Sequence, residues 1–119
     1  MKTEEIANNL VTWFNNNEEA RCYQELYSPN IVSVEATGEY PTAKGMEEIA
    51  KKGEWWNETF EVHSSNASQP IVADNWFSVR FDMDTTHKES GQRSQMSEIG
   101  VYQVKDGKIV KEQFFYDSE

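Results

Sequence analysis

The chain has 119 residues, of which 37% are hydrophobic, enough apolar material for one core and too little for two. The formal net charge is −10, and no cluster of Lys or Arg forms a local basic patch. This charge disfavours nucleic acids and anionic membrane surfaces as partners. No apolar run is long enough for a secretory signal or a membrane span, so we expect one cytoplasmic domain over residues 1–119.

The first part of the chain shows helical spacing. Apolar residues recur every three to four positions from Thr3 to Asn15, and acidic residues occupy the first turn, so the pattern predicts a helix. A second, short helix is expected after the capping-box pair Asn16 and Glu19, and it should end before Ser28-Pro29.

A short strand and a third helix follow. The β-branched run from Ile31 to Val34 predicts a strand, and the segment from Glu35 to Thr42, which contains Gly and Pro, predicts a loop. Apolar and small residues then mark one side of a third helix from Met46 to Trp56.

From Thr59 onward the spacing changes to that of strands. The segment from Thr59 to Ala73 predicts one long strand broken by a bulge at Pro70. The segment from Trp76 to His87 alternates in polarity, as a strand with two different faces does. Two more strands, Gln92 to Val104 and Lys108 to Tyr116, are expected to pair as a hairpin.

The strands of this hairpin are joined by Asp106-Gly107, a strong signal for a type I′ turn. A two-residue turn pairs Lys105 with Lys108 and so sets the register of the strands. The register predicts four side chains on the concave face with the helices: Ile99, Val101, Glu112 and Phe114. It predicts a second set on the outer face: Glu98, Gly100, Tyr102, Lys111, Gln113 and Phe115.

The cysteine and histidine content limits metal and redox chemistry. Cys22 has no second cysteine to pair with, and the sequence contains neither a CxxC nor an HxxxH spacing. We therefore expect no disulfide, no metal site and no cofactor, and we interpret Cys22 as a small buried hydrophobe on a helix. His63 and His87 are interpreted as structural, because a functional histidine needs an orienting partner.

The order helix, helix, strand, helix and antiparallel strands, together with the ending GVYQVKDGKIVKEQFFYD, resembles a known group of proteins. The segment VRFDMDTTH and the Lys44-Gly45 entry to the third helix add to the likeness. The chain resembles the SnoaL-like branch of the nuclear transport factor 2-like superfamily, which includes polyketide cyclases and is similar to ketosteroid isomerase and limonene epoxide hydrolase. The resemblance implies an α+β fold in which a cone-shaped, curved, antiparallel or mixed sheet wraps around three N-terminal helices. It also implies a small-molecule pocket and homodimers.

The resemblance carries some functional positions over to this chain. The Arg-x-Asp with which epoxide hydrolases of this group hold the epoxide and its water matches Arg80-Phe81-Asp82. Their last-strand acid falls at Phe114, and the histidine of many SnoaL-like sequences falls at Glu112. The general base and the oxyanion-side Asp of ketosteroid isomerases fall at Ala36 and Ile99, which disfavours steroid isomerase chemistry.

These positions predict one site with a polar end and an apolar end. Arg80 would hold Asp82 ionised as a base, and apolar neighbours would keep Glu112 partly protonated as an acid. A plainer interpretation makes Arg80 and Asp82 a surface ion pair and Glu112 a charge at a strand edge. The ligand-binding residues are expected to be Trp13, Glu35, Trp56, Ile99, Phe114 and Tyr116.

Three function classes stay open. The first is a cofactor-free acid/base isomerase, cyclase or hydrolase acting on a small hydrophobic, oxygen-bearing substrate. The second is a protein that binds such a ligand without chemistry, and the third is a dimeric interaction domain with a vestigial cavity. The fold does not choose among them, because function resides in sites carried by folds.

The outer sheet face is the expected partner surface. Trp76, Tyr102 and Phe115 are large apolar groups that a monomer seldom leaves together in water. We expect a homodimer that buries this face around Glu98, Gln113 and Phe115, with no nucleic acid or membrane partner.

Overall fold

The computed structural model describes residues 1–36 and 41–117. In this part of the chain three helices accompany a seven-stranded sheet. The helices are α1 (Thr3–Asn15), α2 (Glu19–Glu25) and α3 (Gly45–Thr59). The strands are β1 (Tyr27–Val34), β2 (Thr42–Lys44), β3 (Phe60–Ala67), β4 (Ile71–Ala73), β5 (Trp76–His87), β6 (Arg93–Lys105) and β7 (Lys108–Phe115). The predicted α+β class is confirmed.

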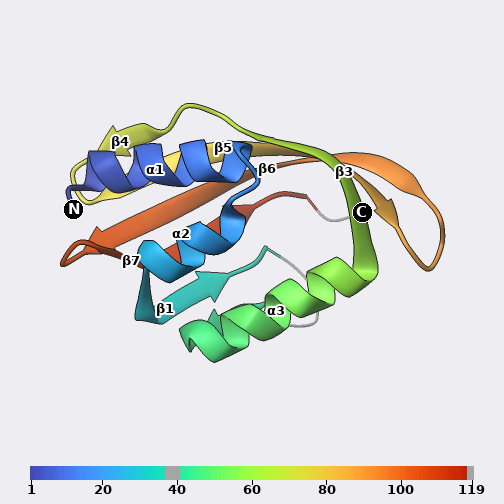
Figure 1. Cartoon of the computed structure of the whole chain (residues 1–119), viewed down its shortest axis with the longest axis horizontal. Helices are drawn as coiled ribbons and strands as arrows, with labels where there is room; N and C mark the ends of the chain where they lie inside the picture. Colours follow the sequence, from blue (N-terminus) through green and yellow to red (C-terminus); the bar gives the residue numbers. More distant parts are fainter. Residues whose placement is uncertain (37–40, 118–119) are drawn as a thin grey trace.

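The sheet is mixed and strongly curved (Figure 1). The strand order is β2-β1-β7-β6-β5-β3, and β4 pairs with β5 beside β3. All pairings are antiparallel except that of β1 with β7. This parallel pair puts the strand that follows α2 next to the last strand, so side chains from both ends of the chain meet on the concave face.

The helices cover the concave face and fill the core. Helix α1 packs against β3 and β5 and buries Ile6, Ala7, Leu10 and Val11, while α3 packs against β1 and β2. The interior is closed from the sheet side by fully buried residues: Ile31, Phe77, Val79 and Ile109. No helix in the described residues is long and apolar enough to cross a membrane.

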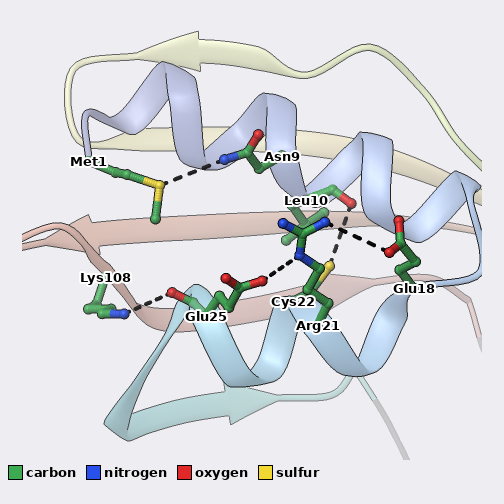
Figure 2. Close-up of polar contacts among 8 residues, drawn as sticks. All are labelled: Met1, Asn9, Leu10, Glu18, Arg21, Cys22, Glu25 and Lys108. Atoms are coloured by element: carbon green, nitrogen blue, oxygen red, sulfur yellow. Dashed lines mark hydrogen bonds and ion pairs between the residues drawn. The ribbon is translucent and has the colours of Figure 1, made fainter.

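Polar contacts join α1, α2 and β7 (Figure 2). The buried Cys22 thiol points to the Leu10 carbonyl oxygen at 3.7 Å, and burial raises the pKa of this thiol to about 12. Arg21 forms ion pairs with Glu18 and Glu25. Lys108 donates a hydrogen bond to the backbone oxygen of Glu25 at 2.8 Å. Cys22 therefore stays a thiol and acts as the predicted small buried hydrophobe.

Several predicted boundaries shift. Strand β1 begins at Tyr27 instead of Ile31, and a short strand, β2, occupies the end of the predicted loop. Residues 37–40 of that loop lie outside the described residues. The predicted long strand is interrupted at residues 68–70, so β3 and β4 pair separately with the two ends of β5. Proline lacks a donor for the ladder, which is consistent with the break at Pro70.

The hairpin register differs from the prediction beyond its first pairs. The turn is as predicted, with positive φ at Asp106 (51°) and Gly107 (76°) and Lys105 opposite Lys108. The register then shifts by one residue between the pairs Val104–Ile109 and Gln103–Lys111, because Val110 is an extra residue on β7. Glu112 therefore lies opposite Tyr102, where Val101 was predicted.

This shift changes which residues share a face. Glu112 and Phe114 face the helices as predicted, but their neighbours on β6 are Tyr102 and Gly100. The predictions that Ile99 and Val101 lie on the concave face and that Glu98, Gly100 and Tyr102 lie on the outer face were wrong. The local register rule assumes an unbroken ladder, and the bulge breaks it.

Candidate functional site

A buried carboxyl, that of Glu112 on β7, lies at the centre of the concave face. Only 3% of Glu112 is exposed. Its Oε1 accepts a hydrogen bond from the Tyr27 hydroxyl, and its Oε2 accepts one from the Ser33 hydroxyl at 3.0 Å. Burial raises the pKa of Glu112, while the Tyr27 hydrogen bond, the charge of Lys52 and the Ser33 hydrogen bond act in the opposite direction. Each oxygen of Glu112 thus already has a donor from the protein.

Lys52 of α3 continues this network toward the end of the sheet. Its ammonium donates a hydrogen bond to Ser33 Oγ at 2.9 Å and forms an ion pair with Glu35, which directly follows β1. Glu35 also accepts a hydrogen bond from the Tyr116 hydroxyl at 2.9 Å. A helix, the end of β1 and the end of β7 are thereby joined through one ammonium group.

A second acid, Glu98 of β6, lies on the same face without such partners. No hydrogen bond or ion pair joins Glu98 to another side chain among residues 1–36 and 41–117. Burial raises the pKa of Glu98 to about 7, and the negative charges of Glu35 and Glu112 add to this rise, while Lys52 opposes it. Glu98 is therefore the carboxyl of this face that is open to a ligand.

Glu98 borders an open hollow at the end of the sheet. Residues just after β1, from the middle of β5 and β6, and from the end of β7 and beyond it line this hollow: Ala36, Arg80, Ser97, Glu98, Ile99, Phe115, Tyr116 and Asp117. The hollow combines two carboxyls, a guanidinium, a hydroxyl and a phenol with three apolar side chains. Its apolar part suits the hydrocarbon body of a ligand, and its polar groups suit a ligand oxygen.

Aromatic rings form the apolar floor beside these carboxyls. The Phe114 ring lies 6.3 Å from the ring of Tyr102 and 6.4 Å from that of Phe81, measured between centroids, and Lys52 Nζ lies 5.1 Å from its centroid. Gly100 makes this packing possible, because a Cβ there would come within 3.0–3.1 Å of all three rings.

The predicted convergence of Arg80, Asp82 and Glu112 is not found. Arg80 and Asp82 alternate along β5 with the buried residues Val79 and Phe81, so they point to the outer face. There Asp82 accepts hydrogen bonds from Arg80 at 3.1 and 3.2 Å and from the Ser97 hydroxyl at 2.6 Å. These contacts lower the pKa of Asp82, with the Ser97 bond as the largest cause. The pair has the geometry of the alternative, a surface ion pair.

The predicted ligand-binding residues divide into three groups. Glu35, Phe114 and Tyr116 lie together around Lys52, as expected for one site. Ile99 is half exposed on the outer face, although it borders the hollow. The other two make contacts elsewhere: Trp13 lies under the guanidinium of Arg21 at 4.0 Å, and Trp56 packs on Phe60 at 4.5 Å.

Four residues of the site were missed by sequence reasoning: Tyr27, Ser33, Lys52 and Glu98. Lys52 carried a readable signal, since it lies three residues after Ile49 and four before Trp56 on the predicted apolar side of the third helix. Ser33 also carried one, because it alternates with Val32 and Val34 in the predicted strand. Tyr27 was assigned to a helix, and Glu98 required knowledge of the bulge.

Within the described residues, no group of three or more His, Cys, Asp and Glu side chains is arranged to hold a metal ion. The acids of the concave face instead contact hydroxyls and one ammonium. The arrangement is suited to holding and exchanging a proton.

Comparison with known proteins identifies a matching family. The family model of the SnoaL-like domain matches residues 1–116. A crystal structure from Mesorhizobium loti, provisionally named a SnoaL-like polyketide cyclase, is 35% identical to this chain and covers 98% of it and 100% of its own length, with a TM-score of 0.93. A search of curated proteins gives no match.

More distant structures share the fold alone. An NTF2-like protein from Burkholderia thailandensis is 19% identical and has a TM-score of 0.84, covering 98% of this chain and 92% of its own. A Bacillus subtilis protein, provisionally named an isomerase, is also 19% identical, with a TM-score of 0.78 and coverage of 98% and 90%.

Proposed function

This chain belongs to the SnoaL-like family, and on that basis we propose that it is a cofactor-free acid/base enzyme whose Glu98 moves a proton on a small, hydrophobic, oxygen-bearing substrate. The substrate would lie in the hollow at the end of the sheet, between Glu98 and Tyr116. The reaction would be an isomerisation, cyclisation or hydrolysis that starts from a proton transfer.

The environment of Glu98 is the observation that carries this proposal. With a pKa of about 7, the carboxyl is present in both protonation states near neutral pH, as a group that takes a proton and later returns it should be. The ionised form would remove a proton from a carbon next to a carbonyl or from a water molecule. The protonated form would return that proton to the product.

The neighbours of Glu98 have distinct roles in this scheme. Arg80 lines the hollow, and Lys52 acts on Glu98 through its charge from the side of α3. The Arg80 guanidinium could stabilise negative charge that develops on a substrate oxygen, while the Tyr116 hydroxyl is engaged with Glu35. Phe114 offers an apolar surface for the hydrocarbon part. Glu112, with donors on both oxygens, is assigned to positioning.

A second candidate function is ligand binding without chemistry. It is favoured by Glu112, which has a protein donor on each oxygen, so that Glu98 is the carboxyl of the concave face without a side-chain partner in the described structure. A protonated Glu98 would then donate one hydrogen bond to a ligand oxygen and transfer nothing.

Deuterium exchange tests the first function directly. Cyclic ketones of different sizes are incubated with the protein in D2O, and deuterium at the carbon next to the carbonyl is measured by mass spectrometry. We expect exchange that rises with pH around a midpoint of about 7 and falls by roughly 100-fold or more in Glu98→Gln. The matched control, Glu89→Gln, changes an exposed acid in the turn between β5 and β6 and should exchange like the wild type.

Two other outcomes separate the candidates. Ketone binding that is weakened by Glu98→Gln, without any exchange, would support the binding protein over the enzyme. A Glu98 carboxyl that titrates near its usual 4.5 in a carbon-13 NMR experiment, with no ketone bound, would contradict both functions.

A further inference from the structure

The lysine of this site occupies an unusual place on its helix. Lys51 and Lys52 are neighbours in α3, but the Lys51 side chain is 72% exposed and that of Lys52 is 24% exposed. Lys51 pairs with Glu47 along the solvent side of the helix. Lys52 instead points from the helix to the sheet, so its ammonium is partly withdrawn from water.

The ammonium of Lys52 interacts with three acids. It contacts Glu35 directly and reaches Glu112 through Ser33, whose hydroxyl accepts from Lys52 and donates to Glu112. It also acts on Glu98 through its charge. Three carboxyls that are withdrawn from water repel one another, and a positive charge among them decides how many are ionised.

The charged and titratable groups around Glu98 come from every neighbouring element. Helix α3 contributes Lys52, the end of β1 contributes Glu35, and β7 contributes Glu112, with Tyr116 just beyond its end. Strand β6 itself contributes Tyr102, and β5 contributes Arg80 at the edge of the hollow, where the arginine is paired with Asp82. Of the two basic residues, Lys52 contacts Glu35 and Ser33 on the concave face, whereas Arg80 contacts Asp82 on the outer face.

We propose that Lys52 is the positioning residue of this site, one ammonium that ties α3 to the sheet through Glu35 and Ser33 and governs the proton exchange of Glu98 and Glu112. The inference rests on the proposed function, since it explains how Glu98 is kept able to give and take a proton. With Lys52 present, Glu98 exchanges its proton near neutral pH. Without it, the protons of Glu98 and Glu112 are held more tightly, and a smaller fraction of Glu98 is ionised at neutral pH.

Carboxyl titration of lysine variants tests this inference. Lys52→Met keeps the length of the side chain and removes its charge, Lys52→Gln also keeps a donor toward Ser33, and Lys52→Arg keeps the charge. The titration midpoints of Glu98 and Glu112 are read by carbon-13 NMR, after circular dichroism has shown which variants are folded. Lys51→Met is the matched control, because it removes the neighbouring charge on the exposed side of α3.

We expect the Glu98 midpoint to rise by about one pH unit in Lys52→Met and Lys52→Gln. It should return close to the wild-type value in Lys52→Arg and stay unchanged in Lys51→Met. The pH profile of ketone exchange should move by the same amount. A role limited to packing would lower the melting temperature and leave these midpoints in place.

The failures of the two proposals are distinguishable. If Glu98 and Glu112 keep their midpoints in a folded Lys52→Met or Lys52→Gln protein, the inference is wrong, and the function proposed for Glu98 stands. If wild-type Glu98 titrates near 4.5, the proposed function fails, while a Glu112 midpoint that rises on loss of Lys52 still supports the inference.

Discussion

Two glutamates on the concave face, Glu112 and Glu98, differ in whether the protein donates hydrogen bonds to their carboxyls. Glu112 is buried with a hydroxyl donor on each oxygen, so the protein supplies what water would have supplied. Glu98 is withdrawn from water without such donors. A carboxyl of the second kind costs free energy when it ionises, and carboxyls with such raised pKa values cluster at functional sites.

This cost predicts a stability change with pH. Since the pKa of Glu98 is about 7 in the folded protein and close to 4.5 in the unfolded chain, the folded protein binds the proton more tightly. The contribution of Glu98 to the free energy of unfolding is therefore full below about pH 4.5 and is lost as the pH rises to about 7. The loss is at most on the order of 3 kcal/mol.

Urea unfolding at pH 5 and pH 8 measures this effect. The wild type should lose more stability between the two pH values than Glu98→Gln, whose amide does not ionise. Glu89→Gln should behave like the wild type. Equal pH dependence in the wild type and Glu98→Gln would show that Glu98 is solvated in the folded protein.

At the scale of elements, the bulge in β7 decides which side chains meet. Val110 lets both Ile109 and Glu112 face the interior, although they are three positions apart and a regular strand would turn one of them outward. Deleting Val110 alone should keep both residues in the core, because Ile109, Lys111 and Glu112 would then alternate as in a regular strand with the same partners on β6. Deleting Val110 and Lys111 together would make Ile109 and Glu112 neighbours and turn one of them outward.

We expect the double deletion of Val110 and Lys111 to cost roughly 3 kcal/mol or more in the free energy of unfolding, because it leaves a buried group unpaired or exposes an apolar one. The single deletion of Val110 is the control and should cost about 1 kcal/mol, since it removes only the local bend of the bulge. Chemical denaturation of the two variants compares them. A single deletion as destabilising as the double one would mean that the bend itself is needed.

The bulge also marks the limit of what the sequence could predict. Helix α1, the alternation of β5 and the Asp106-Gly107 turn follow from local signals, and all three are confirmed. No Gly or Pro near Val110 signals the bulge in the sequence. The bulge follows from tertiary packing, because Ile109 and Glu112 both face the helices. For this reason Glu35, Glu112 and Tyr116 could be placed near one another, while Glu98 was assigned to the wrong face.

The whole molecule leaves an apolar outer face. Ile99 and Phe115 lie opposite one another in the β6–β7 pair, and each is about half exposed, as is Trp76 on β5. Tyr102 and Glu98, which the sequence predicted on this surface, lie on the concave face instead. These apolar side chains keep the homodimer as our prediction. Since Ile99 and Phe115 also line the hollow, the partner would lie at the edge of the hollow.

Light scattering in dilute solution should give about twice the 13.8 kDa mass of the chain. Ile99→Glu and Phe115→Glu would put charges into the contact and should reduce the mass to that of one chain. Trp55→Glu, which changes an exposed apolar residue on α3, should leave the mass as in the wild type. A wild-type mass of one chain would remove the dimer from consideration.

The parallel pairing of β1 with β7 also governs how quickly the protein can fold. Tyr27 and Ser33 reach Glu112 across most of the chain, whereas β5, β6 and β7 pair with their neighbours in sequence. Closing a long loop costs entropy before its contacts can repay it, so the antiparallel strands are expected to form first and β1 to dock late. Until it does, Glu112 lacks its donors and the edge of β7 is unpaired. A slow-docking β1 would thus expose an aggregation-prone edge during refolding, and the buried acid beside it would discourage other strands from binding there.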